Sequence, residues 1–227
     1  MYHAVGTRVK GDFRGIFSVT PDEFKQQMEY LSQHAFIKMT SLELGLMDPA
    51  PCRVSLTFDD GYRDILPVAE KILVPMGIPF VLFITKSYAQ RTGPEYLSKD
   101  AIREISRLAQ VTIGAHGATH KRLTECSDQE LVTELKTSRE FLEDVISKPV
   151  RIMAYPHGAV NERVVQAVVR AGYSIAVSTR AGINNSASHL MKLKRTEISG
   201  LDDLADFKMK IFGAWDWYGV KSWVCKT

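Results

Sequence analysis

The sequence predicts an α/β fold in which mostly parallel strands alternate with amphipathic helices. Short apolar segments are repeatedly followed by longer segments whose apolar residues recur at helical spacing. Counting these units gives about seven βα repeats, enough to close a barrel, with an open doubly wound sheet as the alternative. There is no internal repeat and no Pro/Gly/Ser linker long enough to separate two domains, so we expect one domain over residues 1–227.

The expected helices have clear start signals. Thr20 is an N-cap residue, Pro21 takes the first helical position and Glu23 the third, which is the pattern of a capping box. Ser127 and Glu130 repeat this pattern before a longer periodic segment. Together with the apolar spacing, such signals predict helices over residues 20–31, 64–76, 98–108, 127–146, 161–172 and 202–211.

The expected strands lie between these helices. Residues 80–84 are wholly apolar, as a parallel strand covered on both faces should be. The strong candidates are residues 54–58, 80–84, 111–115, 151–155 and 174–178, and the weaker ones are residues 1–5 and 193–198.

The composition limits which partners and which cellular compartment we expect for this protein. With 45% hydrophobic and 24% charged residues, the chain is typical of a globular protein. The net charge is only +3 and the basic residues are scattered, which argues against nucleic acid as a partner. No apolar stretch is long enough to span a membrane, and no signal peptide is visible. Three isolated cysteines suit a reducing compartment, so we expect a cytoplasmic protein, and no feature fixes its oligomeric state.

Titratable residues follow three of the expected strands. Asp59 and Asp60 follow residues 54–58, while His116 and His120 follow residues 111–115. Each motif by itself also fits an ordinary turn or a surface histidine pair, but in a parallel barrel these strand ends share the rim where active sites lie. Neighbouring aspartates at a strand end point in different directions, so one can bind a metal while the other stays free as a base. Two imidazoles and one carboxylate suit zinc or cobalt and leave coordination positions open.

These motifs carry a resemblance to a known family. Residues 57–61 (Thr-Phe-Asp-Asp-Gly), 116–120 (His-Gly-Ala-Thr-His) and 154–158 (Ala-Tyr-Pro-His-Gly) resemble, in order, the first three motifs of the polysaccharide deacetylases. This is the NodB-homology group, or carbohydrate esterase family 4, and the resemblance covers roughly residues 1–212. It implies a distorted (β/α) barrel of about seven parallel strands and hydrolysis of N-acetyl groups on sugars.

The resemblance also implies roles for single residues. Asp59 would be the catalytic base, and a divalent metal, zinc or cobalt, would be held by Asp60, His116 and His120. The acetyl pocket would be lined by Tyr155 and Pro156, together with the backbone N–H of His157 as an oxyanion donor.

The sequence departs from the family pattern at two places. Ala154 stands where the family often has an arginine oriented toward the base. The late Leu-x-His motif, which supplies the general acid, is missing, and Arg195 lies where it would be expected. His189 and the His157 side chain are the stand-ins for the acid, and Arg195 would bind substrate or orient Asp59. His3, on the first weak strand, could reach the rim, with a place in the core or behind the site as the other interpretation.

The function expected from the sequence is metal-dependent removal of acetyl groups from an N-acetylated sugar or glycan. With no export signal visible, a precursor of a cell-surface polysaccharide is a plausible substrate. Two enzyme alternatives are a deformylase and a cyclic-amide hydrolase on the same fold. A non-catalytic glycan-binding or scaffold relative is the alternative from another class, although clustered aspartates and histidines are costly to keep without a metal.

Overall fold

The computed structural model describes residues 1–34, 37–42 and 52–214, and a curled parallel sheet lies at its centre. Spatial and chain order agree in this sheet, and each strand pairs in parallel with the next. No reversal of strand order, which a doubly wound sheet requires, occurs among these five strands. The strands are β5 (Leu56–Phe58), β6 (Phe80–Ile84), β7 (Val111–Ala115), β8 (Ile152–Ala154) and β9 (Ile175–Val177).

The main sheet has fewer strands than the seven that we expected, because the two weaker candidates pair with it only through isolated contacts. The segments near residues 1–5 and 193–198 lie in the gap between β9 and β5, where irregular backbone pairing closes a distorted barrel. The contacts are a parallel bridge of Tyr2 with Phe58, another of Val177 with Leu193, and a hydrogen bond of 2.9 Å from the Ile198 amide to the Met1 carbonyl.

Two short parallel pairs accompany the main sheet. β1 (Ala4–Val5) pairs with β2 (Ser18–Val19), and β3 (Ile37–Met39) pairs with β4 (Cys52–Val54). The predicted strand over residues 54–58 is thus divided at Ser55 between β4 and β5.

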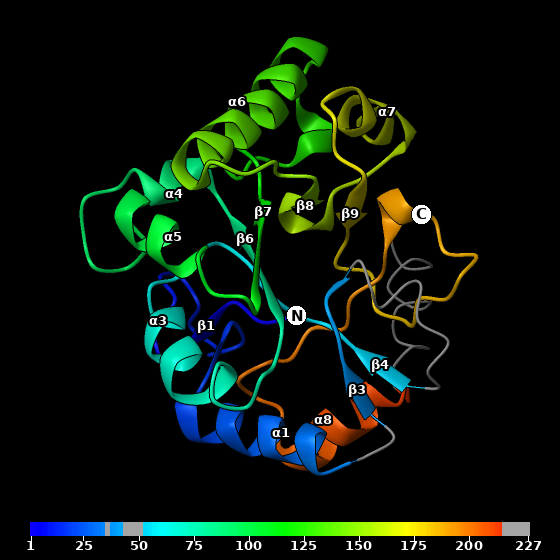
Figure 1. Cartoon of the computed structure of the whole chain (residues 1–227). Helices are drawn as coiled ribbons and strands as arrows, with labels where there is room; N and C mark the ends of the chain where they lie inside the picture. The colour runs from blue at the N-terminus through cyan, green and yellow to red at the C-terminus, as the bar shows by residue number, and fades with distance from the viewer. Residues whose placement is uncertain (35–36, 43–51, 215–227) are drawn as a thin grey trace.

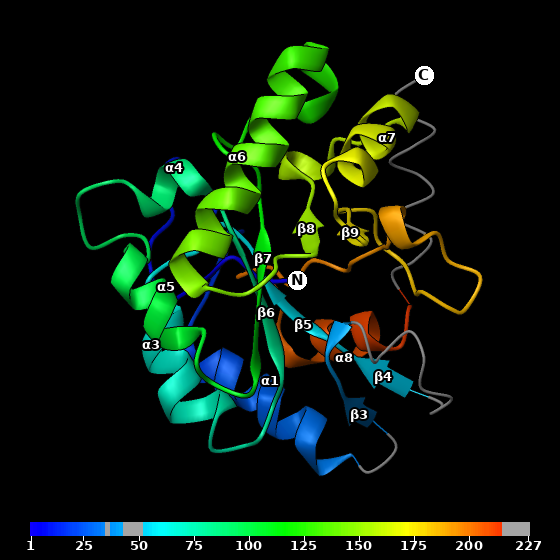
Figure 2. The same cartoon turned by 45° about the horizontal axis from the view of Figure 1, so that its top comes forward.

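Helices surround the strands, as Figures 1 and 2 show. Both predicted capping boxes form, at Thr20 before α1 and at Ser127 before α6. The helix expected over residues 64–76 is a short α-helix that continues as the π-helical segment η1 (Ala69–Leu73). The helices are α1 (Pro21–Gln33), α3 (Ile65–Val68), α4 (Lys86–Ala89), α5 (Lys99–Ile105), α6 (Asp128–Ile146), α7 (Glu162–Arg170) and α8 (Leu204–Ile211), with the 3₁₀ segments η2 (Leu123–Glu125), η3 (Pro156–Gly158) and η4 (Leu190–Lys192).

The core forms where helix faces meet the strands. Phe24, Met28 and Leu31, which recur at helical spacing on α1, are fully buried. Burying each such side chain contributes roughly 1.5–3 kcal/mol relative to leaving it exposed. None of the described helices is long and apolar enough to cross a membrane. The core thus supports a rigid sheet whose strand ends carry the polar residues.

Candidate active site

The polar residues singled out in the sequence gather at one rim of the barrel. β5, β7 and β8 run in the same direction, with β6 between the first two. Residues 59–60, 116–120 and 155–157 directly follow their last residues. These three segments therefore begin at a common edge of the sheet. In a parallel barrel this is the edge that carries active sites.

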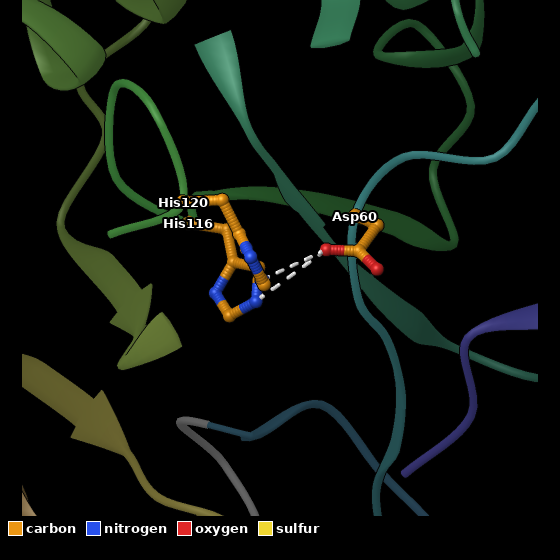
Figure 3. Close-up of side chains that lie close together, drawn as sticks. All are labelled: Asp60, His116 and His120. Carbon is orange, nitrogen blue, oxygen red and sulfur yellow. Dashed lines mark ion pairs between the residues drawn. The ribbon is translucent and has the colours of Figure 1, made fainter. Parts of the chain in front are cut away.

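Asp60, His116 and His120 point toward one another across this rim (Figure 3). His120 Nε2 lies 3.2 Å from Asp60 Oδ1, and His116 Nε2 lies 3.7 Å from the same oxygen. One ligand atom from each residue lies within 4.8 Å of the others. Asp60 (φ 71°) and His120 (φ 63°) both have left-handed backbone, which is uncommon outside glycine and is often found at functional sites.

This donor set fits a divalent metal such as zinc. Asp60 Oδ1 is buried and has no hydrogen-bond partner among the described residues by geometric criteria, although His120 Nε2 lies 3.2 Å away. An orphaned buried acceptor is costly, and a cation would relieve it. His116 Nδ1 lies 2.9 Å from the Ala154 carbonyl oxygen, and donation there leaves the Nε2 lone pair free for a metal.

The charges of these groups support the same interpretation. Burial alone would raise the pKa of Asp60, but the neighbouring His120 and His116 outweigh it, and the pKa is lowered. Burial lowers the pKa of His116 in spite of the two adjacent aspartates, which favours the neutral imidazole. An ionised carboxylate and neutral imidazoles are the forms that bind zinc.

Asp59 forms a buried ion pair with Arg195. The guanidinium donates from Nη1 to Asp59 Oδ1 at 2.6 Å and from Nη2 to Oδ2 at 2.7 Å. It also donates from Nη1 to the Thr57 hydroxyl at 3.1 Å and from Nε to the Ser178 carbonyl at 2.9 Å. Asp59 is 2% exposed and Arg195 6%, so the bidentate pair is shielded from water.

Asp59 nevertheless remains beside the cluster. Its Oδ2 lies 3.8 Å from His116 Nε2. Burial by itself would raise the pKa of Asp59, but the Arg195 guanidinium and then His116 more than offset it, so the pKa lies well below its usual range. Of the two roles expected for Arg195, this geometry favours orienting Asp59, since most of its donors already bind protein acceptors.

The third motif lies beside the histidines. Tyr155 is fully buried, and its hydroxyl donates to the Met191 carbonyl at 2.8 Å, away from solvent. Pro156 is buried at the start of η3, while His157 is exposed with a left-handed backbone (φ 57°). The His157 ring lies 4.5 Å from the His120 ring, and its Nε2 lies 3.2 Å from the His120 carbonyl.

His189 is not brought to this cluster. It is exposed at the N-cap of η4, where its Nδ1 accepts from the Met191 amide at 3.1 Å. None of the hydrogen bonds, ion pairs or ring contacts found for it in the described part of the chain reaches Asp60, His116 or His120.

His3 lies at the rim, next to the site. Tyr2 forms a parallel bridge with Phe58, and the Asp59 amide donates to the Tyr2 carbonyl at 2.9 Å, so the His3 backbone lies beside that of Asp59. Its Nδ1 is buried without a hydrogen-bond partner and lies 3.7 Å from Glu197 Oε1. The position of His3 could be predicted from the sequence, because a first strand that pairs in parallel with residues 54–58 places His3 next to Asp59.

Known proteins are similar to this chain in fold and in sequence. Streptococcus pyogenes deacetylase PplD, solved in complex with acetate, superposes with a TM-score of 0.82 at 25% identity, covering 93% of this chain and 96% of that one. The Bacillus subtilis protein YxkH is 25% identical over 205 residues, covering 88% of this chain and 70% of that protein. The poly-beta-1,6-N-acetyl-D-glucosamine N-deacetylase of Staphylococcus aureus is 24% identical over 189 residues, 75% of this chain and 64% of that protein.

A family comparison agrees with these likenesses. Residues 47–176, more than half of the 227 residues, match the model of the polysaccharide deacetylase family. This segment holds all three motifs at the rim of the barrel. The chain therefore belongs to the polysaccharide deacetylase family.

Proposed function

We propose that this chain is a metal-dependent N-deacetylase that hydrolyses acetyl groups on an N-acetylated sugar or glycan. The observation that carries the proposal is the convergence of Asp60, His116 and His120 beside a carboxylate, Asp59, that is held separately. A divalent ion held by these three residues, zinc or cobalt, would polarise the amide carbonyl and lower the pKa of the attacking water.

Asp59 is proposed to accept the proton of that water. Its lowered pKa keeps it ionised at neutral pH, but it also makes the carboxylate a weak base. Its contribution must then come mainly from position, which Arg195 fixes through two parallel hydrogen bonds. Arg195 would thereby keep the carboxylate apart from the three proposed metal ligands.

We assign the proton donor to the leaving amine to His3 in the first place. Its backbone lies beside that of Asp59, and Glu197 faces its Nδ1 at 3.7 Å. An imidazole is the side chain that most often serves as a general acid in such a proton transfer. His157 is the second candidate, because it contacts His120 at the mouth of the site.

The acetyl group is proposed to bind against η3. The backbone N–H of His157 would donate to the developing oxyanion, and Pro156 would form the pocket wall. Tyr155 would support this wall from behind, since its hydroxyl is already engaged by Met191. Acetate, the product expected here, is the ligand named for the S. pyogenes structure.

A polymer of N-acetylglucosamine is the substrate to test first, because the S. aureus relative is named for deacetylating one. The biological product would then be a partly de-N-acetylated cell-surface polysaccharide or its precursor. Mild positive charge neither requires nor excludes an acidic glycan.

The test is acetate release from N-acetylated sugars, nucleotide-sugars and oligosaccharides, with and without chelator. We expect release that a chelator abolishes and zinc restores. Asp59→Asn should abolish turnover while retaining metal, whereas Asp144→Asn on α6 should behave like the wild type. Metal binding without acetate from any substrate would contradict the proposal, and formate release, cyclic-amide hydrolysis and glycan binding would be measured next.

A further inference from the structure

The loop of residues 116–120, which carries both proposed histidine ligands, is held on its carbonyl side by the chain around α4. Its carbonyl groups accept hydrogen bonds there, from the Thr85 hydroxyl to His116 at 3.2 Å, from the Lys86 amide to Gly117 at 3.2 Å, and from the Ser87 amide to Ala118 at 2.8 Å. This side of the loop is therefore satisfied by neighbours that are close in space but not in sequence.

The amide side of the same loop is held by one side chain, Glu134 of α6. Glu134 Oε2 accepts from the Ala118 amide at 2.8 Å and from the Thr119 amide at 2.9 Å. Its other oxygen, Oε1, accepts from the Thr119 hydroxyl. The side chain is 5% exposed, so both oxygens of a buried carboxylate accept hydrogen bonds from this loop.

The loop needs such support because its backbone is unusual. Gly117 (φ 75°) and His120 (φ 63°) are both left-handed, the second without the freedom of glycine. A Cβ placed on Gly117 would lie 3.2 Å from Glu134 Oε2, so the carboxylate packs directly against the turn. Without it, the buried Ala118 amide and the partly buried Thr119 amide would lose their acceptor, and the loop would have to rearrange to recover one.

We propose that Glu134 is a positioning residue whose carboxylate fixes residues 116–120 in the shape that brings His116 and His120 to one metal ion. This inference rests on the metal site of the proposed function. Glu134 touches neither imidazole and acts only through the loop backbone, as partners behind metal ligands do.

The test compares Glu134→Ala, Glu134→Asp and Glu134→Gln with a control on the same helix, Glu140→Ala. Glu140 is exposed and forms an ion pair with Lys136 at 3.6 Å. Aspartate keeps the charge but is too short to reach the loop, whereas glutamine keeps an acceptor for both amides. Two quantities are measured on folded protein: hydrogen exchange of the Ala118 and Thr119 amides without metal, and the Kd for Zn²⁺ by competition with a chelating dye.

We expect Glu134→Ala and Glu134→Asp to speed exchange at both amides and to weaken Zn²⁺ binding about 10–100-fold. Glu134→Gln should recover most of the protection from exchange and most of the Zn²⁺ affinity. Glu140→Ala should match the wild type in both measurements. Unchanged exchange and Kd in Glu134→Asp would overturn the inference, as would lower thermal stability with an unchanged Kd. If the wild type binds no Zn²⁺, the proposed function fails, while the exchange comparison still decides whether Glu134 fixes the loop.

Discussion

Replacing Arg195 by glutamine tests how the proposed base is held. The substitution removes both hydrogen bonds to Asp59, of 2.6 and 2.7 Å, and leaves a carboxylate that is only 2% exposed without its cation. Hydrogen bonds to charged groups contribute about 1.5–3 kcal/mol each, and breaking a buried ion pair from one side costs about 3–5 kcal/mol. We therefore expect the free energy of unfolding to fall by about 3–5 kcal/mol.

The same substitution should act on turnover more than on binding. If Arg195 aims Asp59, kcat should fall about 10²-fold or more while KM changes little. The pH dependence should change as well. Arg195 lowers the folded-state pKa of Asp59, so its stabilising contribution is present above the unfolded pKa of about 3.9 and is lost as pH falls toward the folded value. In Arg195→Gln the loss of the guanidinium raises that pKa relative to the wild type, so the acid limb of kcat/KM should move to higher pH.

The assay is acetate release across a pH series, with urea unfolding of the same preparations. Arg151→Gln is the control, because Arg151 is exposed just before β8, at the opposite end of the strand from the site. An unchanged kcat with a tenfold higher KM would show that Arg195 binds substrate instead. An unchanged free energy of unfolding would refute the buried pair itself.

Other substitutions separate the remaining roles. His3→Ala should lower kcat about 10²-fold, whereas His189→Ala should leave it unchanged; a loss with His157→Ala alone would move the proton donor to that residue. His116→Ala should purify without stoichiometric metal, as measured by atomic absorption, and full metal content would contradict its assignment. Tyr155→Phe should cost about 1 kcal/mol of unfolding free energy with near-normal turnover, and a large loss of kcat would show a direct role for the hydroxyl.

Local sequence signals predicted much of the architecture. The capping boxes at Thr20 and Ser127 begin α1 and α6 where expected, because capping involves residues only three positions apart. The apolar segment at residues 80–84 is the buried strand β6. Strands next to the gap in the barrel were harder to predict, because their pairing depends on distant partners rather than on their own composition.

The rim motifs were also visible in the sequence. Asp60, His116 and His120 could be grouped from their positions after the strands, because parallel strands bring their carboxyl ends to one edge. Their shared proximity is confirmed, while their role as metal ligands stays a prediction. The sequence could not show that Asp60 Oδ1 is buried without a hydrogen-bond donor, which is the observation that favours a cation there.

By itself, the sequence determined the type of fold, the starts of the main helices and the residues that gather at the rim, since these follow from short-range patterns and strand direction. Only the tertiary structure decided which groups surround the proposed base. Arg195 meets Asp59 across 136 positions of chain and the Thr57 hydroxyl across 138. Such contacts arise where the barrel closes, and closure depends on how the whole chain packs, which no local pattern specifies.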